Sequence, residues 1–564
     1  MPFAWLWLLP SDMKSFSQSL VAVSFFSSNF LFCMTSGYYE NAAELNPLLH
    51  TWSLAVEEQY YVLFPMFLLL TWRIGKCRIL AIISVVFIIS LSLAQWGAYR
   101  YPNFAFYLLP SRGWELLIGV LISFYLSAEA KGKLISQSVS QLVSIIGLLL
   151  ITYAIFAFDK KTPFPSLYSL IPTIGAAIII LYANSDTLVG KLLGSKLFVG
   201  IGLISYSAYL WHQPIFSFAR QRSLGETSSL LLSALAIGSF ILAYLSWRYV
   251  ETPFRSSIRV NRHHIVIVAT LGSFICCVFG LIGHLNNGYR KRIPIATEIA
   301  GIELPRIDNG WCFYHVEGIS DLALGSKGLD CFLGDKSSDI KGVLFGDSYA
   351  GQYEPLWDGV GRSANVRINS ISTNFCYPSV NEDFTGPKSG RSFQQCIYNR
   401  KYFVDNILSF DFVILGGQWG VVLDQDKMAG VFDLIDFIAP RVKLVIVMSS
   451  PKQFDQNIML NYRKSIFFSE PFDITKFSNR NDKSAAEANS LLQVKSKQYK
   501  NVLFVDRSAL FSINGKLSDV TSENFPFSLD GGHISVYGSQ STVGSFLSSD
   551  IYSDIKRYFI FLRK

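Results

Sequence analysis

The chain has 564 residues, of which 50% are hydrophobic and 16% are charged, and its formal net charge at pH 7 is +8. It is too long for one ordinary core and too poor in charge for a typical soluble protein, so we expect one membrane-embedded region and one globular region. Residues 1–284 hold 18 Lys and Arg against 11 Asp and Glu. A positive excess placed there orients helices in a membrane rather than binding nucleic acid, which is excluded as a partner.

Nine apolar runs in the first half are each long enough to cross a bilayer. They predict spans at residues 17–35, 54–72, 79–98, 113–128, 138–158, 166–185, 198–217, 228–247 and 264–284. Basic residues such as Arg73, Lys191 and Arg248 recur in alternate connecting loops, which marks that side of the membrane as cytoplasmic. We therefore expect membrane lipid as a partner and everything after about residue 285 outside the cytoplasm.

Ionisable residues in or beside these spans are costly to bury and are usually functional. Five of them are expected near the outer ends of their helices: Glu57, Glu58, Arg112, Glu115 and His212. If they cluster, they form a polar cavity capable of acid and base chemistry. Taken alone, Glu58 is explained equally well as an interfacial carboxylate, Arg112 as its structural ion-pair partner and His212 as an aromatic-belt residue.

Cysteine placement agrees with this division. Four cysteines lie in or beside the spans, and four lie in the second half with no metal-ligand spacing, so no metal site is expected: Cys312, Cys331, Cys376 and Cys396. In an oxidising compartment we would pair neighbours, the first with the second and the third with the fourth. Four cysteines allow three connectivities, and four unpaired thiols are the alternative.

The second half is predicted to be an α/β domain. Strand-like runs separated by stretches long enough for crossover helices favour a parallel sheet covered on both faces, and they lie at residues 341–345, 412–415, 442–448 and 501–505. Ligands bind such sheets beyond the carboxyl ends of the strands. The expected organisation is a membrane domain, a connection and a catalytic domain, at residues 1–284, 285–335 and 336–564.

A candidate nucleophile, Ser348, follows the first of these strands. Asp530 and His533 lie on one glycine-containing turn, so the carboxylate can orient the imidazole that activates the serine hydroxyl. An oxyanion would be bound by the Ser348 backbone N–H and by donors at Gly417 and Gln418. A Gly-Asp-Ser segment alone is often only a turn, but the late Asp-x-x-His strengthens the assignment.

These three segments resemble the motif blocks of the SGNH (GDSL-like) esterase and acyltransferase superfamily. The resemblance implies that Ser348 forms an acyl-enzyme and that Asp530 and His533 complete its triad. Two positions differ from the family pattern. Tyr349 stands where membrane-linked members usually carry His, and Gln418 stands where an Asn often supplies an oxyanion donor.

The first half resembles the acyltransferase 3 family of integral-membrane O-acyltransferases. Four ordered segments carry the resemblance, and the first adds His50 to the membrane-domain candidates: residues 46–59, 112–115, 205–212 and 251–254. Fused to an SGNH domain, the arrangement is similar to bacterial O-antigen and peptidoglycan O-acetyltransferases. The expected location is the bacterial inner membrane with a periplasmic C-terminal domain, because the loop charges place that domain outside the cytoplasm and its cysteines can form disulfides. Acetyl-CoA is the expected donor, with no bound cofactor, and a surface glycan such as lipopolysaccharide is the expected acceptor.

The family normally begins with a helix that bears an Arg or Lys and, about ten residues later, the His regarded as catalytic. Nothing upstream of Lys14 matches that helix, so we expect a truncated N-terminus and weak or no transfer by this polypeptide alone. The leading hypothesis is a glycan O-acyltransferase. The alternatives are a membrane-anchored extracytoplasmic carbohydrate esterase, a transporter or sensor without enzymatic activity, and an inactive remnant.

Overall fold

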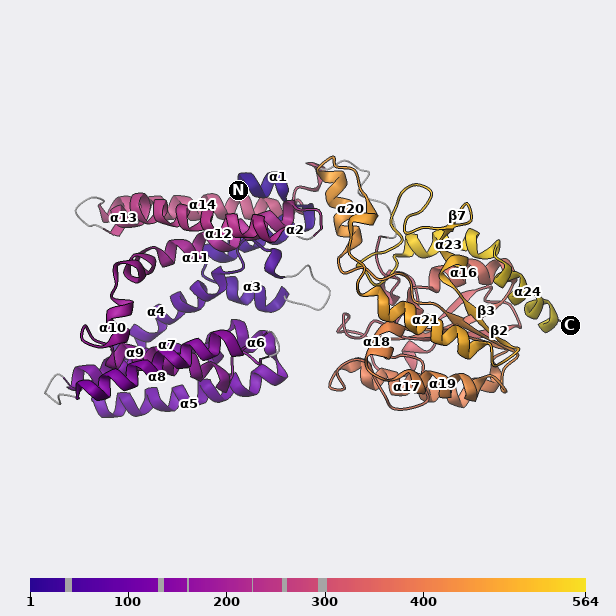
Figure 1. Cartoon of the computed structure of the whole chain (residues 1–564), viewed down its shortest axis with the longest axis horizontal. Coiled ribbons are helices and arrows are strands. Elements are labelled where there is room, and N and C mark those ends of the chain that lie inside the picture. The colour runs from indigo at the N-terminus through magenta and orange to yellow at the C-terminus, as the bar shows by residue number, and fades with distance from the viewer. Residues whose placement is uncertain are drawn as a thin grey trace. The chain divides into compact units, whose positions relative to one another are not determined.

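The computed structural model divides the chain into two compact units, Met1–Arg292 and Ile293–Lys564. In Figure 1 the first unit is indigo to magenta and the second is largely orange to yellow. The residues that the structure describes are 1–35, 43–129, 136–159, 162–225, 227–255, 261–292 and 302–563. Residues 293–301 of the expected connection therefore lie outside the described part of the chain.

The described part of the first unit consists of helices and loops (Figure 1). Four pairs of helices pack side by side: α2 with α14, α5 with α7, α8 with α9, and α11 with α12. The α-helices are α1 Pro2–Trp7, α2 Pro10–Ser24, α3 Ser28–Thr35, α4 Thr51–Thr71, α5 Lys76–Arg100, α6 Pro102–Tyr107, α7 Leu109–Glu129, α8 Gln137–Ala157, α9 Leu170–Tyr182, α10 Leu188–Leu193, α11 Lys196–Arg222, α12 Ser229–Ser246, α13 Thr252–Arg255 and α14 Arg262–Leu285.

Five segments of the described residues are helical, long enough and apolar enough to cross a membrane: Lys76–Arg100, Pro102–Ser127, Gln137–Ala157, Ser229–Arg255 and Arg262–Leu285. The predicted count of nine spans is not confirmed. The expected span 17–35 is divided, because α2 ends at Ser24 and Phe26 adopts a positive φ of 50° before α3 begins. The expected span 166–185 contains the shorter apolar helix Leu167–Tyr182.

Large apolar side chains on the outside of these helices indicate a hydrocarbon environment. Leu69, Leu70 and Phe156 are 81%, 81% and 85% exposed. Between helices, small residues allow close approach, since a Cβ on Gly147 of α8 would lie 2.8 Å from the Gly175 carbonyl oxygen of α9. The first unit thus has the outward apolar surface and the close helix contacts of a membrane protein.

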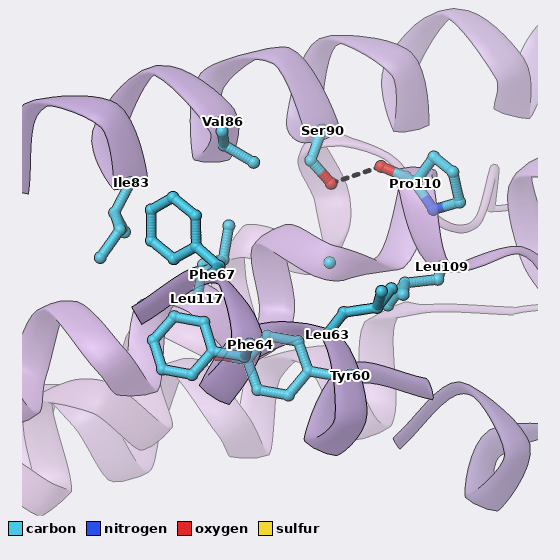
Figure 2. Close-up of a pocket in the computed structure, with 11 residues that line it drawn as sticks. Tyr60, Leu63, Phe64, Phe67, Ile83, Val86, Ser90, Leu109, Pro110 and Leu117 are labelled. Carbon is cyan, nitrogen blue, oxygen red and sulfur yellow. Dashed lines mark hydrogen bonds between the residues drawn. The ribbon is translucent and has the colours of Figure 1, made fainter. Parts of the chain in front are cut away.

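An apolar cavity of about 290 Å³ lies among α4, α5 and α7 (Figure 2). At its wall, Ser90 Oγ donates to the Pro110 carbonyl at 2.6 Å and accepts from Trp114 N at 3.0 Å. Apart from the hydroxyl of the lining residue Tyr60, which has no hydrogen-bond partner among the described residues, the cavity offers a ligand hydrocarbon contact. Its lining consists of Tyr60, Leu63, Phe64, Phe67, Ile83, Val86, Ser90, Leu109, Pro110, Gly113 and Leu117.

The second unit is built on a six-stranded sheet with the order β1-β3-β2-β4-β5-β6. Strands β2 to β6 pair in parallel, whereas the edge strand β1 pairs antiparallel with β3, so the sheet is mixed rather than wholly parallel as predicted. The strands are β1 Phe332–Gly334, β2 Lys341–Gly346, β3 Arg367–Ser372, β4 Phe412–Gly416, β5 Leu444–Met448 and β6 Val502–Val505, beside a small ribbon of β7 Ser512–Ile513 and β8 Lys516–Leu517.

Helices cover both faces of this sheet (Figure 1). Alternate strand residues point to opposite faces, so that Leu344, Ile414 and Ile446 join one core while Val343 and Val413 join the other. Helices α16, α23 and α24 pack on the first core, and α17, α18, α19 and α21 pack on the second. The helices are α15 Ser348–Gly351, α16 Glu354–Ala364, α17 Arg391–Asn406, α18 Trp419–Asp424, α19 Met428–Ile438, α20 Ile458–Phe467, α21 Asp482–Ser496, α22 Arg507–Leu510, α23 Val536–Leu547 and α24 Asp550–Leu562.

Disulfides join Cys312 to Cys331 and Cys376 to Cys396, the neighbouring pairs expected from the sequence.

Next to the first disulfide, the Glu354 carboxylate is fully buried and accepts hydrogen bonds from Cys312 N at 2.7 Å and from the Ser370 hydroxyl at 2.7 Å. Burial raises the pKa of Glu354 to about 7.

Candidate active site

Ser348 lies at the carboxyl end of β2, where the chain turns sharply into α15. A Cβ on Gly346 would lie 1.8 Å from the Gly416 carbonyl oxygen, so only glycine allows β2 and β4 to approach this closely. Asp347 caps α15 by accepting a hydrogen bond from Tyr349 N at 2.8 Å. The turn therefore leaves the Ser348 side chain at the edge of the sheet where parallel α/β proteins bind ligands.

The structure brings the three predicted catalytic residues together. Ser348 Oγ lies 2.8 Å from His533 Nε2, and His533 Nδ1 lies 2.8 Å from Asp530 Oδ2. Because an ionised carboxylate only accepts, Nδ1 carries the proton and Nε2 is left to accept the serine proton. This is the hydrogen-bonded order that activates a serine hydroxyl as a nucleophile.

Electrostatics favour the same protonation states. Burial alone would raise the pKa of Asp530, but the charge of His533 and the backbone N–H groups of Gly532 and His533 hold it well below its ordinary value. Burial alone would lower the pKa of His533, but the Asp530 carboxylate outweighs it and raises the pKa. The pair thus supplies a fixed negative charge and a base stronger than an ordinary histidine.

Asp347 connects the nucleophile turn to the loop after β4. Its carboxylate is 2% exposed and accepts from the Gln418 backbone N–H at 2.9 Å. Burial raises the pKa of Asp347 to about 6. Because Asp347 binds the Gln418 backbone N–H, the oxyanion donors still proposed from this loop are the Gly417 N–H and the Gln418 side-chain amide, whose Nε2 donates to the Tyr349 hydroxyl at 3.4 Å.

Sequence reasoning missed Gln453, which follows β5 in a loop. Its side chain contacts Tyr349, which packs on His533, and the carbonyl of Gly532, which lies between Asp530 and His533. A glutamine in a loop carries no pattern that distinguishes it from an exposed polar residue. Only the folded turn brings it to the triad.

The membrane-domain candidates form two separate pairs. The rings of His50 and His212 lie 5.6 Å apart, and Tyr209 donates to the His50 carbonyl at 2.6 Å. Arg112 forms an ion pair with Glu115 at 3.0 Å. The Arg112 guanidinium also lies 4.7 to 5.8 Å from the ring centroids of three aromatic residues, Trp52, Phe106 and Phe164.

Glu57 and Glu58 lie on α4 outside both pairs. Glu57 is half-buried and Glu58 is exposed. In the part of the chain that the structure describes, no hydrogen bond or ion pair joins either carboxylate to the other four candidates, so the single polar cavity expected from the sequence stays a prediction. Nor do the described residues contain a group of three His, Cys, Asp or Glu placed to hold a metal ion.

Family comparisons cover both units. Residues 2–248 match a family described as an acyltransferase domain, and residues 312–547 match a family described as an SGNH domain fused to such acyltransferase domains. An uncharacterized protein of Haemophilus influenzae is 34% identical over 179 residues, which cover 30% of this chain and 72% of that protein.

A named relative is the peptidoglycan O-acetyltransferase OatA of Listeria monocytogenes, which is 26% identical over 268 residues. The match covers 45% of this chain and 42% of the relative, so the chain spans less than half the length of that relative. The solved periplasmic domain of a Salmonella Paratyphi A lipopolysaccharide acetyltransferase aligns with 39% of this chain and with 85% of that domain. The sequence identity is 15% and the TM-score is 0.30, which is too low to support a shared fold.

Proposed function

Because the chain belongs to the acyltransferase 3 family and carries a fused SGNH domain, we propose that it transfers an acyl group to a hydroxyl of a cell-surface glycan. The named relative supports acetyl as the group and a cell-envelope glycan as the acceptor. Lipopolysaccharide is the acceptor proposed from the sequence resemblance. The hydrogen-bonded series Ser348–His533–Asp530 is the observation on which the proposal depends.

In the first half-reaction, Ser348 Oγ attacks the carbonyl carbon of the donor's acyl group while His533 Nε2 accepts the hydroxyl proton. The tetrahedral oxyanion is stabilised by backbone N–H groups at Ser348 and Gly417 and by the Gln418 side chain. The bond to the leaving group then breaks, and His533 returns the proton to that group. The product is an ester between the acyl group and Ser348, and Asp530 keeps its negative charge throughout.

In the second half-reaction, a glycan hydroxyl takes the place of the leaving group. His533 accepts its proton, the glycan oxygen attacks the acyl carbon, and the bond to Ser348 Oγ breaks. The serine recovers its proton from His533. Water can attack in the same way, so transfer requires that a bound glycan displace water from the site.

The first unit is proposed to deliver the acyl group from acetyl-CoA on the cytoplasmic side. Ionisable groups among membrane helices are costly and usually serve the transported or reacting group, which supports a role for the His50–His212 and Arg112–Glu115 pairs. Glu57 and Glu58 are proposed to contribute negative charge in the N-terminal half of α4. No bound cofactor is needed for this chemistry.

The proposed location is the bacterial inner membrane, with the second unit in the periplasm. Basic residues in alternate loops of the first half support that orientation. Two disulfides in the second unit support an oxidising compartment for it.

The experiment compares acetyl esters on surface glycans from cells that express the wild type, Ser348→Ala or Ser541→Ala. Ser541 is an exposed serine of α23 and serves as the matched control. We expect the wild type and the control to raise the ester content equally, by a small amount if transfer is as weak as the sequence predicts, and Ser348→Ala to leave it at the level of cells without the gene. An ester content lowered by the wild type would identify a carbohydrate esterase instead. Equal esterification by Ser348→Ala would remove this serine from the mechanism.

A further inference from the structure

A second series of hydrogen bonds crosses the candidate site beside the Ser348–His533 contact. We propose that Tyr349 and Gln453 are positioning residues that hold the Asp530–His533 turn against α15, an inference that rests on the proposed function. Neither residue touches the reacting atoms. Their role is to keep His533 Nε2 within hydrogen-bond distance of the serine hydroxyl while the acyl group enters and leaves.

The series of hydrogen bonds from Tyr349 through Gln453 to the Asp530–His533 turn is called the bridge below. Tyr349 is its first residue and directly follows the nucleophile. Its side chain is 1% exposed, and its ring centroid lies 4.6 Å from that of the His533 imidazole, so the two rings are in contact and tilted by 47°. The Tyr349 hydroxyl donates to Gln453 Oε1 at 2.9 Å. Burial raises the pKa of Tyr349 far above its ordinary value, so the hydroxyl remains a donor at every physiological pH.

Gln453 continues the bridge to the triad turn. Its Nε2 donates to the Pro451 carbonyl at 2.9 Å and to the Gly532 carbonyl at 3.2 Å. Both partners are acceptors, so the amide nitrogen must face them and the amide oxygen must face Tyr349. These partners therefore fix the orientation of the Gln453 side-chain amide.

The backbone on both sides of the bridge is itself fixed. Gln453 N donates to Asp482 Oδ1 at 2.9 Å, and the Arg507 guanidinium binds the same carboxylate at 2.7 and 2.9 Å. Phe454 N donates to the Gly531 carbonyl at 2.8 Å. The segment after β5 thus holds the triad turn through backbone and side-chain contacts together.

Glycine is required where the turn meets the bridge. A Cβ on Gly532 would lie 2.6 Å from the Tyr349 hydroxyl oxygen and 3.2 Å from Gln453 Oε1. Gly531 has a φ of +104°, and a Cβ there would lie 2.4 Å from the Gln456 carbonyl oxygen. Gly532 therefore allows the close approach of Tyr349 and Gln453, and Gly531 allows the bend of the turn and the close approach of the segment after β5.

The test uses the detergent-solubilised full chain and a fluorophosphonate probe, which phosphonylates an activated serine whether or not transfer occurs. The rate of Ser348 labelling is measured from pH 5 to pH 9 for the wild type, Tyr349→Phe, Gln453→Met, the double variant and Gln425→Met. Gln425 is an exposed glutamine that bonds to the Thr385 carbonyl, and it is the matched control. Thermal unfolding identifies any variant that fails to fold, and Tyr349→Phe keeps the buried ring.

We expect Gln453→Met to lower the plateau rate about tenfold, as loss of a supporting hydrogen bond does at other sites. The midpoint of the rate against pH should move to lower pH, because a loosened turn weakens the contact of His533 with Asp530. The titratable groups that face His533 are Asp530, Asp347 and Tyr349. The double variant should cost no more than the larger single effect, since both changes break one bridge.

A merely structural role would lower the amount of labelled protein without moving the midpoint, and that result overturns the inference. Labelling of both single variants at the wild-type rate and midpoint also overturns it, while leaving the proposed function intact. A wild type that never reacts with the probe at Ser348 overturns the proposed serine mechanism, and the positioning role with it.

Discussion

The two units treat their polar groups in opposite ways. In the second unit, polar side chains converge at the carboxyl end of the sheet, where Ser348, His533 and Asp530 bond in series and Gln453 supports them. In the first unit, four of the ionisable candidates lie in two separate pairs, His50–His212 and Arg112–Glu115, and the cavity in Figure 2 is lined mainly by apolar side chains. A water-facing unit can gather many polar groups at one site, whereas ionisable groups among membrane helices are costly and few.

If the two units are separate in this way, the reactivity of Ser348 depends on the second unit alone. Asp530→Asn should lower the fluorophosphonate labelling rate of Ser348 about 10⁴-fold. The amide favours the tautomer of His533 that cannot accept the serine proton, and it does not stabilise the imidazolium that forms during the reaction. Asp554→Asn, on an exposed aspartate that pairs with Arg557, should label like the wild type. Labelling of Asp530→Asn at the wild-type rate would place the essential carboxylate elsewhere.

The buried carboxylate of Glu354 tests the stability of the second unit. Its pKa is about 7 in the folded protein against about 4.5 when unfolded, so its contribution to stability is present below pH 4.5 and is lost as the pH rises to 7. Glu354→Gln removes this dependence and keeps the shape of the side chain. The stability of the variant relative to the wild type should therefore rise between pH 4 and pH 8, by at most about 3 kcal/mol.

Hydrogen exchange of β2 and β4 amides in the full chain measures that free energy of unfolding. Glu487→Gln, on an exposed glutamate of α21, is the matched control and should show no such trend. A relative stability of Glu354→Gln that falls with rising pH would mean that the carboxylate is already ionised and stabilising in the fold.

Arg112 tests whether the first unit acts on delivery rather than on the serine. Arg112→Lys keeps the charge but loses the planar guanidinium that lies near Trp52, Phe106 and Phe164. We expect transfer from acetyl-CoA to glycan to fall about tenfold, a loss typical of one desolvated cation–π contact, while labelling of Ser348 stays unchanged.

Arg100→Lys, at the exposed end of α5, is its control. A fall in Ser348 labelling of Arg112→Lys would contradict the division of labour between the two units. Unchanged transfer would remove Arg112 from the delivery step.

Much of the second unit could be predicted because its signals are local. The strands β2, β4, β5 and β6 are continuous apolar runs, and Asp530 and His533 lie on one turn, so few geometries were available. The edge strand β1 has only three residues, and its antiparallel pairing with β3 depends on a chain reversal that no short motif records. The sequence could not tell which group of Gln418 would act as a donor, because only the folded structure places its backbone N–H on the buried carboxylate of Asp347.

The first unit was harder to predict because hydropathy alone does not place helix boundaries. A single positive φ at Phe26 divides one apolar run into α2 and α3. Helix α4 is long enough to span a membrane, but it contains Glu57 and Glu58 at neighbouring positions. Its length therefore favours a span, whereas its two carboxylates do not. Pairing of His50 with His212 requires contacts between segments more than 150 residues apart, which periodicity cannot supply.

The most direct measurement is the mass of the peptide that contains Ser348 after membranes holding the full chain are mixed with acetyl-CoA and quenched rapidly in acid. We expect one added acetyl group on Ser348, which disappears when glycan acceptor is supplied and which never forms in His533→Ala. Acetylation of the glycan with no acetyl group on Ser348 at any quench time would contradict this expectation.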